Sequence, residues 1–280
     1  MDLFIILTSV FVPIVQLNSI GFDDVSFLQL PLLHDASYNT TQRKSHGVNG
    51  DNSPHLHEIV HPETFTALVH SPRGIVGPSP LLLFLHGAEL MGSNISDLLA
   101  PKAAGYPPKL LVDEEAPAEL KDSFVLVVPQ TNHGWVKDEV VSFTKFLLSS
   151  SSGLSIDQGR LYLVGHSMGA GAVLEAATTG IYAAIAAMSP CDAPASAELA
   201  GVPVWAFHAK NDAVCNYSLS VSLISSLRAD GADADHARLT LFEEAPAAFG
   251  IPERAGHGSY FLALKMKELY TWLLGWKNYP

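Results

Sequence analysis

The chain has 280 residues, of which 48% are hydrophobic, enough for one large domain, whereas two domains would each have little core. A net charge of −12 and the lack of any Lys/Arg run argue against nucleic acid as a partner. Two cysteines are too few for a disulfide framework and lack the spacing of a metal site.

The first residues form a separate apolar segment. Residues 3–15 are an apolar run of 13 residues, too short for an ordinary membrane span but of the length of a signal-peptide core. Asp2 precedes the run and no Lys or Arg does, which departs from a typical signal peptide. We assign residues 1–21 as a signal or an apolar N-terminal segment and expect no stable membrane span. We expect the protein to be secreted or to reside in the secretory pathway, with the cytoplasm as the alternative. Three glycosylation sequons, at Asn39, Asn94 and Asn216, weakly favour export.

A polar stretch separates this segment from the rest of the chain. Residues 22–60 are interpreted as a polar linker, because Asn, Ser, Thr, Gly and His dominate most of it. His55, His57 and His61 would share one face of an extended segment. Three histidines can bind zinc, but no carboxylate-rich motif accompanies them, and a solvent-facing strand edge is the preferred interpretation. Residues 61–280 are expected to form a single domain.

Apolar runs of strand length alternate with helical segments from residue 65 onward. The predicted strands are 65–69, 81–85, 124–128, 160–164, 183–188, 202–208 and 238–242. The predicted helices are 136–148, 168–178, 218–229 and 260–276. From residue 81 on the strands are nearly continuous hydrophobic runs, which is typical of strands buried on both faces. The alternation predicts an α/β fold in which helices cover both faces of a mostly parallel sheet.

A Gly-x-Ser-x-Gly motif occupies residues 165–169, between a predicted strand and a predicted helix. In this context Ser167 lies on a sharp turn that lifts its Oγ clear of the sheet. Gly165 and Gly169 suit the turn because larger side chains would crowd it. The start of the helix offers unpaired backbone N–H groups to a developing oxyanion. Ser167 is therefore the candidate nucleophile.

A serine nucleophile requires a base, and the base requires an acid that orients it. In this arrangement the order along the chain is serine, acid, histidine, each just past a strand. Asp212 follows the predicted strand 202–208, and His257 lies after the last strand and before the final helix. Order and context both match, so Asp212 and His257 are the candidate acid and base.

Three other acidic residues lie at strand ends. Asp192 follows the strand before that of Asp212 and is the alternative acid. Glu243 and Glu244 end a strand but lie too close in sequence to His257 to be preferred.

Three further histidines lie near the expected site. His166 adjoins the serine, and the turn is expected to direct its side chain away from Oγ. His208 lies at a strand end and is interpreted as structural. His133, in a loop at the same edge of the sheet, is a lesser candidate for substrate contact.

An oxyanion must be held by two N–H groups. One is the amide of Met168, the residue after the nucleophile. The other is expected from the loop after strand 81–85, where the small pair Gly87-Ala88 lets the backbone approach the substrate. We choose the amide of Ala88. A plain strand-terminating turn at His86-Gly87 is the alternative, which the nearby serine motif disfavours.

Several blocks of the chain together resemble the α/β-hydrolase superfamily, and within it an esterase branch of predicted peptidases near polyhydroxybutyrate depolymerases and feruloyl esterases. The resemblance covers residues 65–280 and rests on segments 82–88, 128–130, 161–170, 203–208 with Asp212, and 269–274. It implies the α/β-hydrolase fold, with Ser167, Asp212 and His257 as a catalytic triad and Ala88 and Met168 as oxyanion donors. The chain departs from the pattern at Glu89 and in segment 243–256, which is longer than the usual turn before the histidine.

These features predict a serine hydrolase that cleaves a small-molecule or polymeric carboxylic ester through an acyl-enzyme. No metal or organic cofactor is implied. A serine peptidase of the same fold is the nearest alternative, since the same machinery cleaves amides. A non-catalytic, hydrolase-like binding protein is the alternative from a different class, and it would require a broken triad.

The two cysteines follow successive predicted strands. Cys191 and Cys215 are both expected at the carboxyl edge of the sheet. A disulfide between them needs Cα atoms within roughly 7 Å and would brace the loop that carries Asp212. Two unpaired, partly buried thiols are the alternative.

Overall fold

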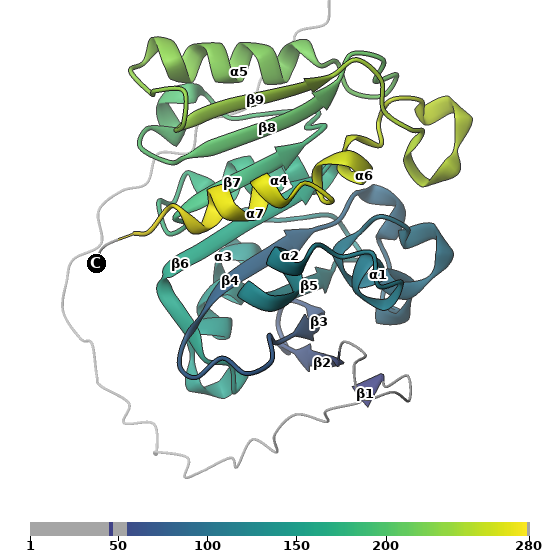
Figure 1. Ribbon diagram of the computed structural model, residues 1–280, viewed down its shortest axis with the longest axis vertical. Coiled ribbons are helices and arrows are strands. Elements are labelled where there is room, and N and C mark those ends of the chain that lie inside the picture. Colours follow the sequence, from purple (N-terminus) through teal and green to yellow (C-terminus); the bar gives the residue numbers. More distant parts are fainter. Residues whose placement is uncertain (1–44, 47–54, 279–280) are drawn as a thin grey trace, which may run out of the picture. The chain divides into compact units, whose positions relative to one another are not determined.

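A β-sheet forms the centre of the protein (Figure 1). The computed structural model describes residues 45–46 and 55–278, so the predicted segment 1–21 and most of the predicted linker lie outside the described residues. The strands are β1 (Ser45–His46), β2 (Leu56–Val60), β3 (Thr66–His70), β4 (Ser79–Leu85), β5 (Val125–Gln130), β6 (Ile156–His166), β7 (Ala184–Met188), β8 (Val204–Ala209) and β9 (Ala237–Phe242). Their order across the sheet is β1-β2-β3-β5-β4-β6-β7-β8-β9.

Strand direction divides the sheet into an antiparallel edge and a parallel body. β1, β2 and β3 pair antiparallel with their neighbours, including the β3–β5 pair. The pairs from β5 across to β9 are parallel. Strands β4, β5, β7 and β8 are buried at every position, which explains their continuous apolar sequences. The carboxyl ends of the parallel strands therefore meet at one edge, where their loops can build a site.

Helices cover both faces of the sheet, which separates two hydrophobic cores (Figure 1). One core is covered by α1 (Pro107–Val112), α2 (Ala118–Ser123), α6 (Ser259–Ala263) and α7 (Lys267–Leu274). The other is covered by α3 (Lys137–Leu148), α4 (Met168–Ala177) and α5 (Ser218–Ala229). Along β4, Leu82 and Phe84 enter the first core while Leu81 and Leu83 enter the second, as the two-residue period of a strand requires. The predicted sheet, mostly parallel and covered on both faces, is confirmed.

The sheet begins earlier in the chain than the sequence indicated. β2 lies inside the stretch 22–60 that was interpreted as a polar linker, and it pairs with β3 along its whole length. Leu56 and Ile59 are buried, which explains why a segment with so few apolar residues still joins the sheet. The folded part therefore starts by Leu56 and not at residue 61.

The predicted final helix, 260–276, is two helices. α6 ends at Ala263 and α7 begins at Lys267, with Met266 in an extended conformation between them (φ −80°, ψ 113°). The Tyr270 hydroxyl donates to the carbonyl of Leu264 at 2.6 Å, which satisfies an acceptor that the broken helix leaves open. The apolar spacing does not reveal the break because both helices face the same core.

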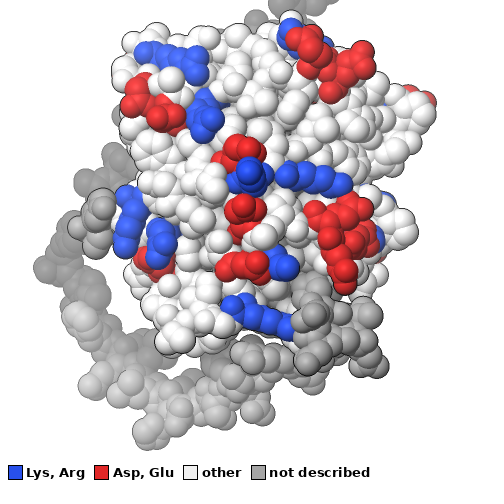
Figure 2. Space-filling model, viewed as in Figure 1, with Lys and Arg blue, Asp and Glu red and all other residues white. Residues whose placement is uncertain are grey.

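Charged side chains of both signs are interspersed on the molecular face turned toward the viewer in Figure 2. Some form ion pairs between distant parts of the chain, such as Lys265 with Glu115 at 2.6 Å.

Among the described helices, none combines the length and the apolar composition that crossing a bilayer would demand.

Candidate active site

The turn from β6 into α4 places Ser167 at the carboxyl edge of the sheet. Its dihedral angles are φ 56° and ψ −121°, and a positive φ is rare for a residue with a side chain. Two contacts close the turn and leave no room for a Cβ: Gly165 lies against the Gly169 carbonyl, and Gly169 lies against the Leu85 carbonyl. The predicted strand, turn and helix around the motif are therefore present, and Ser167 sits at the apex of the turn.

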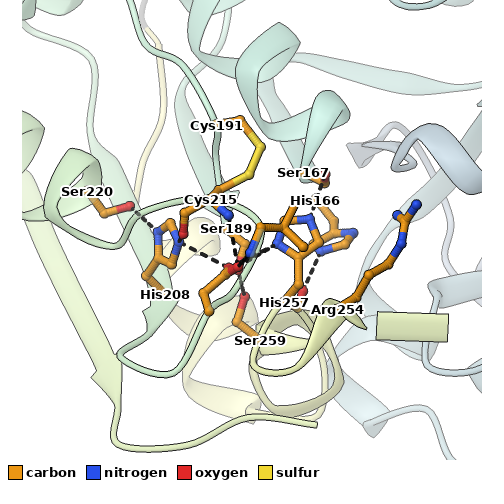
Figure 3. The surroundings of a disulfide bond; sticks show 12 residues. His166, Ser167, Ser189, Cys191, His208, Cys215, Ser220, Arg254, His257 and Ser259 are labelled. Carbon is orange, nitrogen blue, oxygen red and sulfur yellow. Dashed lines mark hydrogen bonds and ion pairs between the residues drawn. A yellow bond between two sulfur atoms is a disulfide. The ribbon is translucent and has the colours of Figure 1, made fainter. Parts of the chain in front are cut away.

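His257 lies directly beside the serine (Figure 3). Its Nε2 is 2.8 Å from Ser167 Oγ, and its ring is completely buried. The preceding Gly256 has a φ of +74° and packs against the backbone of Asn211, which excludes a side chain there. Because Asn211 directly precedes Asp212, this contact holds the histidine loop against the acid loop.

Asp212 follows β8 and accepts hydrogen bonds from four groups. His257 Nδ1 lies 2.9 Å from Oδ2, and the amides of Val214 and Cys215 each donate to Oδ1 at 2.9 Å. The fourth donor is His208, whose Nε2 lies 3.2 Å from Oδ2. Burial alone would raise the pKa of Asp212, but the hydrogen bonds from both histidines and from the Cys215 amide hold that pKa far below its ordinary value. The ionised carboxylate fixes the proton on Nδ1 of His257, so Nε2 is left as an acceptor toward the serine.

The other candidate acids do not reach His257 within the described residues. Asp192 packs against α4, where its carboxylate occupies the space beside Gly171. Glu243 forms an ion pair with a lysine, and Glu244 is exposed.

His208 contacts the acid directly, although the sequence indicated only a structural role. Its Nε2 lies 2.9 Å from the carbonyl oxygen of Cys215 as well as 3.2 Å from Asp212. Because a carbonyl only accepts, Nε2 carries the proton, and Nδ1 accepts from the Ser220 hydroxyl at 2.8 Å. The one sequence signal for this contact is the position of His208, four residues before the acid at the end of the same strand.

His166 bonds to the backbone and to a tyrosine. Its Nε2 lies 2.8 Å from the carbonyl oxygen of His257, and its Nδ1 lies 2.7 Å from the hydroxyl of Tyr106. Tyr106 belongs to no recognisable motif, and sequence reasoning missed it. Its hydroxyl also accepts from the amide of Gly87 at 3.1 Å.

Two unpaired backbone amides border the serine. Ala88 opens a 3₁₀ helix (Ala88–Leu90) and Met168 opens α4, so neither N–H has a partner inside its own helix. Neither donates to any other group in the part of the chain that the structure describes. Both residues line the same cavity as Ser167, whereas the amide of Gly87 is already bonded.

A cavity of about 470 Å³ opens at the serine, lined by Ala88, Trp135, Lys137, Ser167, Met168, Gly171, Ala172, Glu175, Cys191 and Asp192. The indole N–H of Trp135 donates to the carbonyl of His86 at 2.9 Å, which fixes one wall. His133 does not line this cavity and instead contacts Glu139 at 3.1 Å. A cavity of about 520 Å³ beside His70 contains none of the candidate residues.

A disulfide joins Cys191 and Cys215, whose Cα atoms are 4.9 Å apart (Figure 3). Sequence reasoning left this pairing open. The bond connects the loop after β7, which lines the cavity, to the loop after β8, which carries Asp212. Among the described residues, one group of potential metal ligands lies close enough together to share an ion, namely Cys191, Cys215 and His257. This group does not fit a metal, because the two sulfurs are bonded to each other.

Solved structures with this architecture exist, although no protein-family model and no curated protein matches the sequence. A thermostable esterase matches 80% of this chain with a TM-score of 0.61 and 21% identity, and the chain spans 63% of the esterase. A protein described as a dienelactone hydrolase, from Klebsiella pneumoniae subsp. pneumoniae MGH 78578, matches 75% of this chain and 92% of its own length, with a TM-score of 0.54 and 15% identity. The chain therefore has the α/β-hydrolase fold.

Proposed function

We propose that this protein is a serine hydrolase that cleaves carboxylic esters through an acyl-enzyme intermediate. One observation carries the proposal: continuous hydrogen bonds connect Ser167 Oγ through His257 to Asp212, beside two amides that have no partner among the described residues. The similar structures, an esterase and a dienelactone hydrolase, agree with a hydrolase of this fold.

In the proposed mechanism each of these groups acts at a defined step. Ser167 Oγ attacks the ester carbonyl carbon and its proton passes to Nε2 of His257. Asp212 stabilises the imidazolium and keeps the ring in place. The N–H groups of Ala88 and Met168 hold the oxyanion of the tetrahedral intermediate. His257 then protonates the departing alcohol, and a water molecule activated by the same nitrogen releases the acid and restores the serine hydroxyl.

The substrate is a small-molecule or polymeric ester. A cavity of about 470 Å³ at the serine is within the usual range of small-molecule sites. Trp135 offers an apolar wall, while Lys137, Glu175 and Asp192 make the rim polar. In this proposal the carbonyl oxygen of the ester lies within reach of both amide N–H groups, and the rest of the substrate occupies this cavity.

We further propose that the protein works in an oxidising compartment outside the cytoplasm. The disulfide between Cys191 and Cys215 supports this location, because such bonds persist mainly in secreted proteins. Asn94 and Asn216, which lie in glycosylation sequons, are both exposed.

The test combines a fluorophosphonate probe with substrate panels. Wild type should be labelled stoichiometrically and the Ser167→Ala variant should not, with p-nitrophenyl esters of several chain lengths hydrolysed faster than matched peptides. Hydrolysis of peptides at a comparable rate would instead assign a serine peptidase. Absence of labelling in folded wild type would assign a non-catalytic binding protein.

A further inference from the structure

A chain of buried hydrogen bonds links the loop of the expected oxyanion donor to the base. The amide of Gly87 donates to the Tyr106 hydroxyl at 3.1 Å, and that hydroxyl lies 2.7 Å from His166 Nδ1. His166 Nε2 lies 2.8 Å from the carbonyl oxygen of His257. We propose that Tyr106 is a positioning residue, whose hydroxyl holds the N–H of Gly87 and thereby sets the loop that presents the next N–H, that of Ala88, for oxyanion binding. This inference rests on the proposed function.

The direction of each bond follows from the groups themselves. The carbonyl of His257 can only accept, so Nε2 of His166 must carry a proton. Burial holds the pKa of His166 well below its ordinary value, and the ring is therefore neutral with an unprotonated Nδ1. The Tyr106 hydroxyl donates to that nitrogen and accepts from Gly87, and burial raises the pKa of Tyr106 and keeps the phenol intact. Every donor in the chain has an acceptor.

This arrangement distinguishes the two amides of the loop. The Gly87 N–H is occupied by Tyr106, while the next N–H, that of Ala88, has no partner among the described residues and borders the cavity of the serine. A Cβ at residue 87 would lie 3.1 Å from both the Tyr106 hydroxyl and His166 Nδ1. A glycine at this position therefore permits the close approach on which the hydrogen bond depends.

The same hydrogen bonds connect four segments that are distant in sequence. Gly87 and Tyr106 are 19 residues apart, Tyr106 and His166 are 60 apart, and His166 and His257 are 91 apart. Loss of the Tyr106 hydroxyl would leave two buried groups without partners, the Gly87 N–H and the His166 Nδ1. The loop would shift to satisfy its amide, and small displacements of an oxyanion donor have a large effect on rate.

The neighbouring Tyr260 is a matched control. Its ring lies 4.6 Å from that of Tyr106 and 4.4 Å from that of His166, measured between centroids. Its buried hydroxyl makes no hydrogen bond of acceptable geometry with the described residues, although the backbone of Phe249 lies near it. Tyr260→Phe therefore removes the same atom from the same cluster without breaking a link of the chain.

The experiment measures kcat and KM on p-nitrophenyl acetate for wild type, Tyr106→Phe and Tyr260→Phe, with thermal unfolding of each. It also measures inhibition by a trifluoromethyl ketone, whose serine adduct carries an oxyanion. In Tyr106→Phe we expect kcat to fall and the inhibition constant to rise by a similar factor of about 10 to 100, with KM changed less than about threefold. In Tyr260→Phe both quantities should stay within about threefold of wild type.

A fall in stability without the matched loss of kcat and inhibitor affinity would overturn the proposal, because a merely structural hydroxyl gives that result. Should Tyr106→Phe fail to fold, His166→Gln is measured instead, since glutamine can donate to the His257 carbonyl from its ε nitrogen but carries no acceptor at the δ position, where His166 Nδ1 accepts from Tyr106. Wild-type kinetics in that variant would equally overturn it. Ser167→Ala is run in parallel: if it hydrolyses the ester like wild type, the proposed function itself fails, whereas an inactive Ser167→Ala beside a fully active Tyr106→Phe rejects the positioning role alone.

Discussion

Replacing Asp212 by asparagine perturbs the site while changing hardly any volume. The carboxylate accepts from four donors, two backbone amides at Oδ1 and two histidine nitrogens at Oδ2. An asparagine oxygen can replace Oδ1, and its NH₂ group then faces the nitrogens of His208 and His257. His208 keeps its proton on Nε2 because the Cys215 carbonyl also accepts from it. The NH₂ group of the asparagine and the N–H of His208 would therefore face each other as two donors.

The loss of rate follows from the tautomer of His257. To avoid the same clash, His257 must present a lone pair at Nδ1, and its proton moves to Nε2. That nitrogen lies 2.8 Å from Ser167 Oγ and can no longer accept the serine proton. We expect kcat/KM to fall by about 10³- to 10⁴-fold, equivalent to about 4 to 5.5 kcal/mol of transition-state stabilisation.

The assay is ester hydrolysis at saturating and limiting substrate, with Asp192→Asn as the control. Asp192 lines the same cavity and packs on α4, and it makes no hydrogen bond to His257 among the described residues. Its variant should lose less than about tenfold. The reverse ranking of the two variants would refute the assignment of Asp212.

Asp212 also predicts an acid dependence of stability. Its pKa in the folded protein is depressed, so the carboxylate stabilises the fold above the ordinary carboxyl value of 3.8, and this contribution is lost as the pH falls below that value. Thermal unfolding of wild type and Asp212→Asn should therefore differ most near neutral pH and converge in acid. A difference in Tm that does not depend on pH would contradict this reasoning.

The remaining predictions concern the serine, its turn and the disulfide. Ser167→Ala should lower kcat by roughly 10⁴-fold or more with an unchanged circular dichroism spectrum, and activity within tenfold of wild type would exclude the serine as nucleophile. Gly169→Ala forces a Cβ against the Leu85 carbonyl and should cost about 3 kcal/mol or more of unfolding free energy, measured by denaturant titration; a stable variant would show that the turn can relax. Replacing Cys191 and Cys215 together by serine should cost about 3 kcal/mol, because the bond closes a 24-residue separation, and thiol counting on denatured, unreduced wild type should find no free thiol.

The sequence located the parallel body of the sheet because buried parallel strands are continuous apolar runs. β4, β7 and β8 were recognisable for that reason, and each predicted segment lies within about two residues of the observed strand. The residues at the ends of these strands, Asp212 among them, could then be placed at one edge. The grouping of Ser167, Asp212 and His257 was predicted from their order along the chain and from the resemblance to α/β-hydrolases, whereas the order of the strands across the sheet was not predicted.

What the sequence did not reveal depends on contacts between distant segments. β2 pairs with the edge of β3 and buries Leu56 and Ile59, but these two residues are three apart and so do not show the two-residue period by which a strand is recognised in a sequence. Tyr106 and His208 join the site through hydrogen bonds whose partners are fixed only by packing. For His208 the one signal was its position four residues before Asp212. For Tyr106 neither amino-acid type nor spacing gave a signal, since a buried tyrosine in an apolar stretch resembles any other core residue.

Under the proposed function, the spacing of Ser167, Asp212 and His257 along the chain sets the point in synthesis at which the serine gains its base. Ser167 and His257 are 90 residues apart, and Asp212 precedes His257 by 45. A chain synthesised only through the loop after β8 contains Ser167 and Asp212 but lacks His257, so it has no such acceptor for the proton of Oγ. In this proposal the serine becomes reactive only after the segment beyond β9 has been made and Gly256 packs against Asn211, and we expect an unfinished chain not to be acylated by esters.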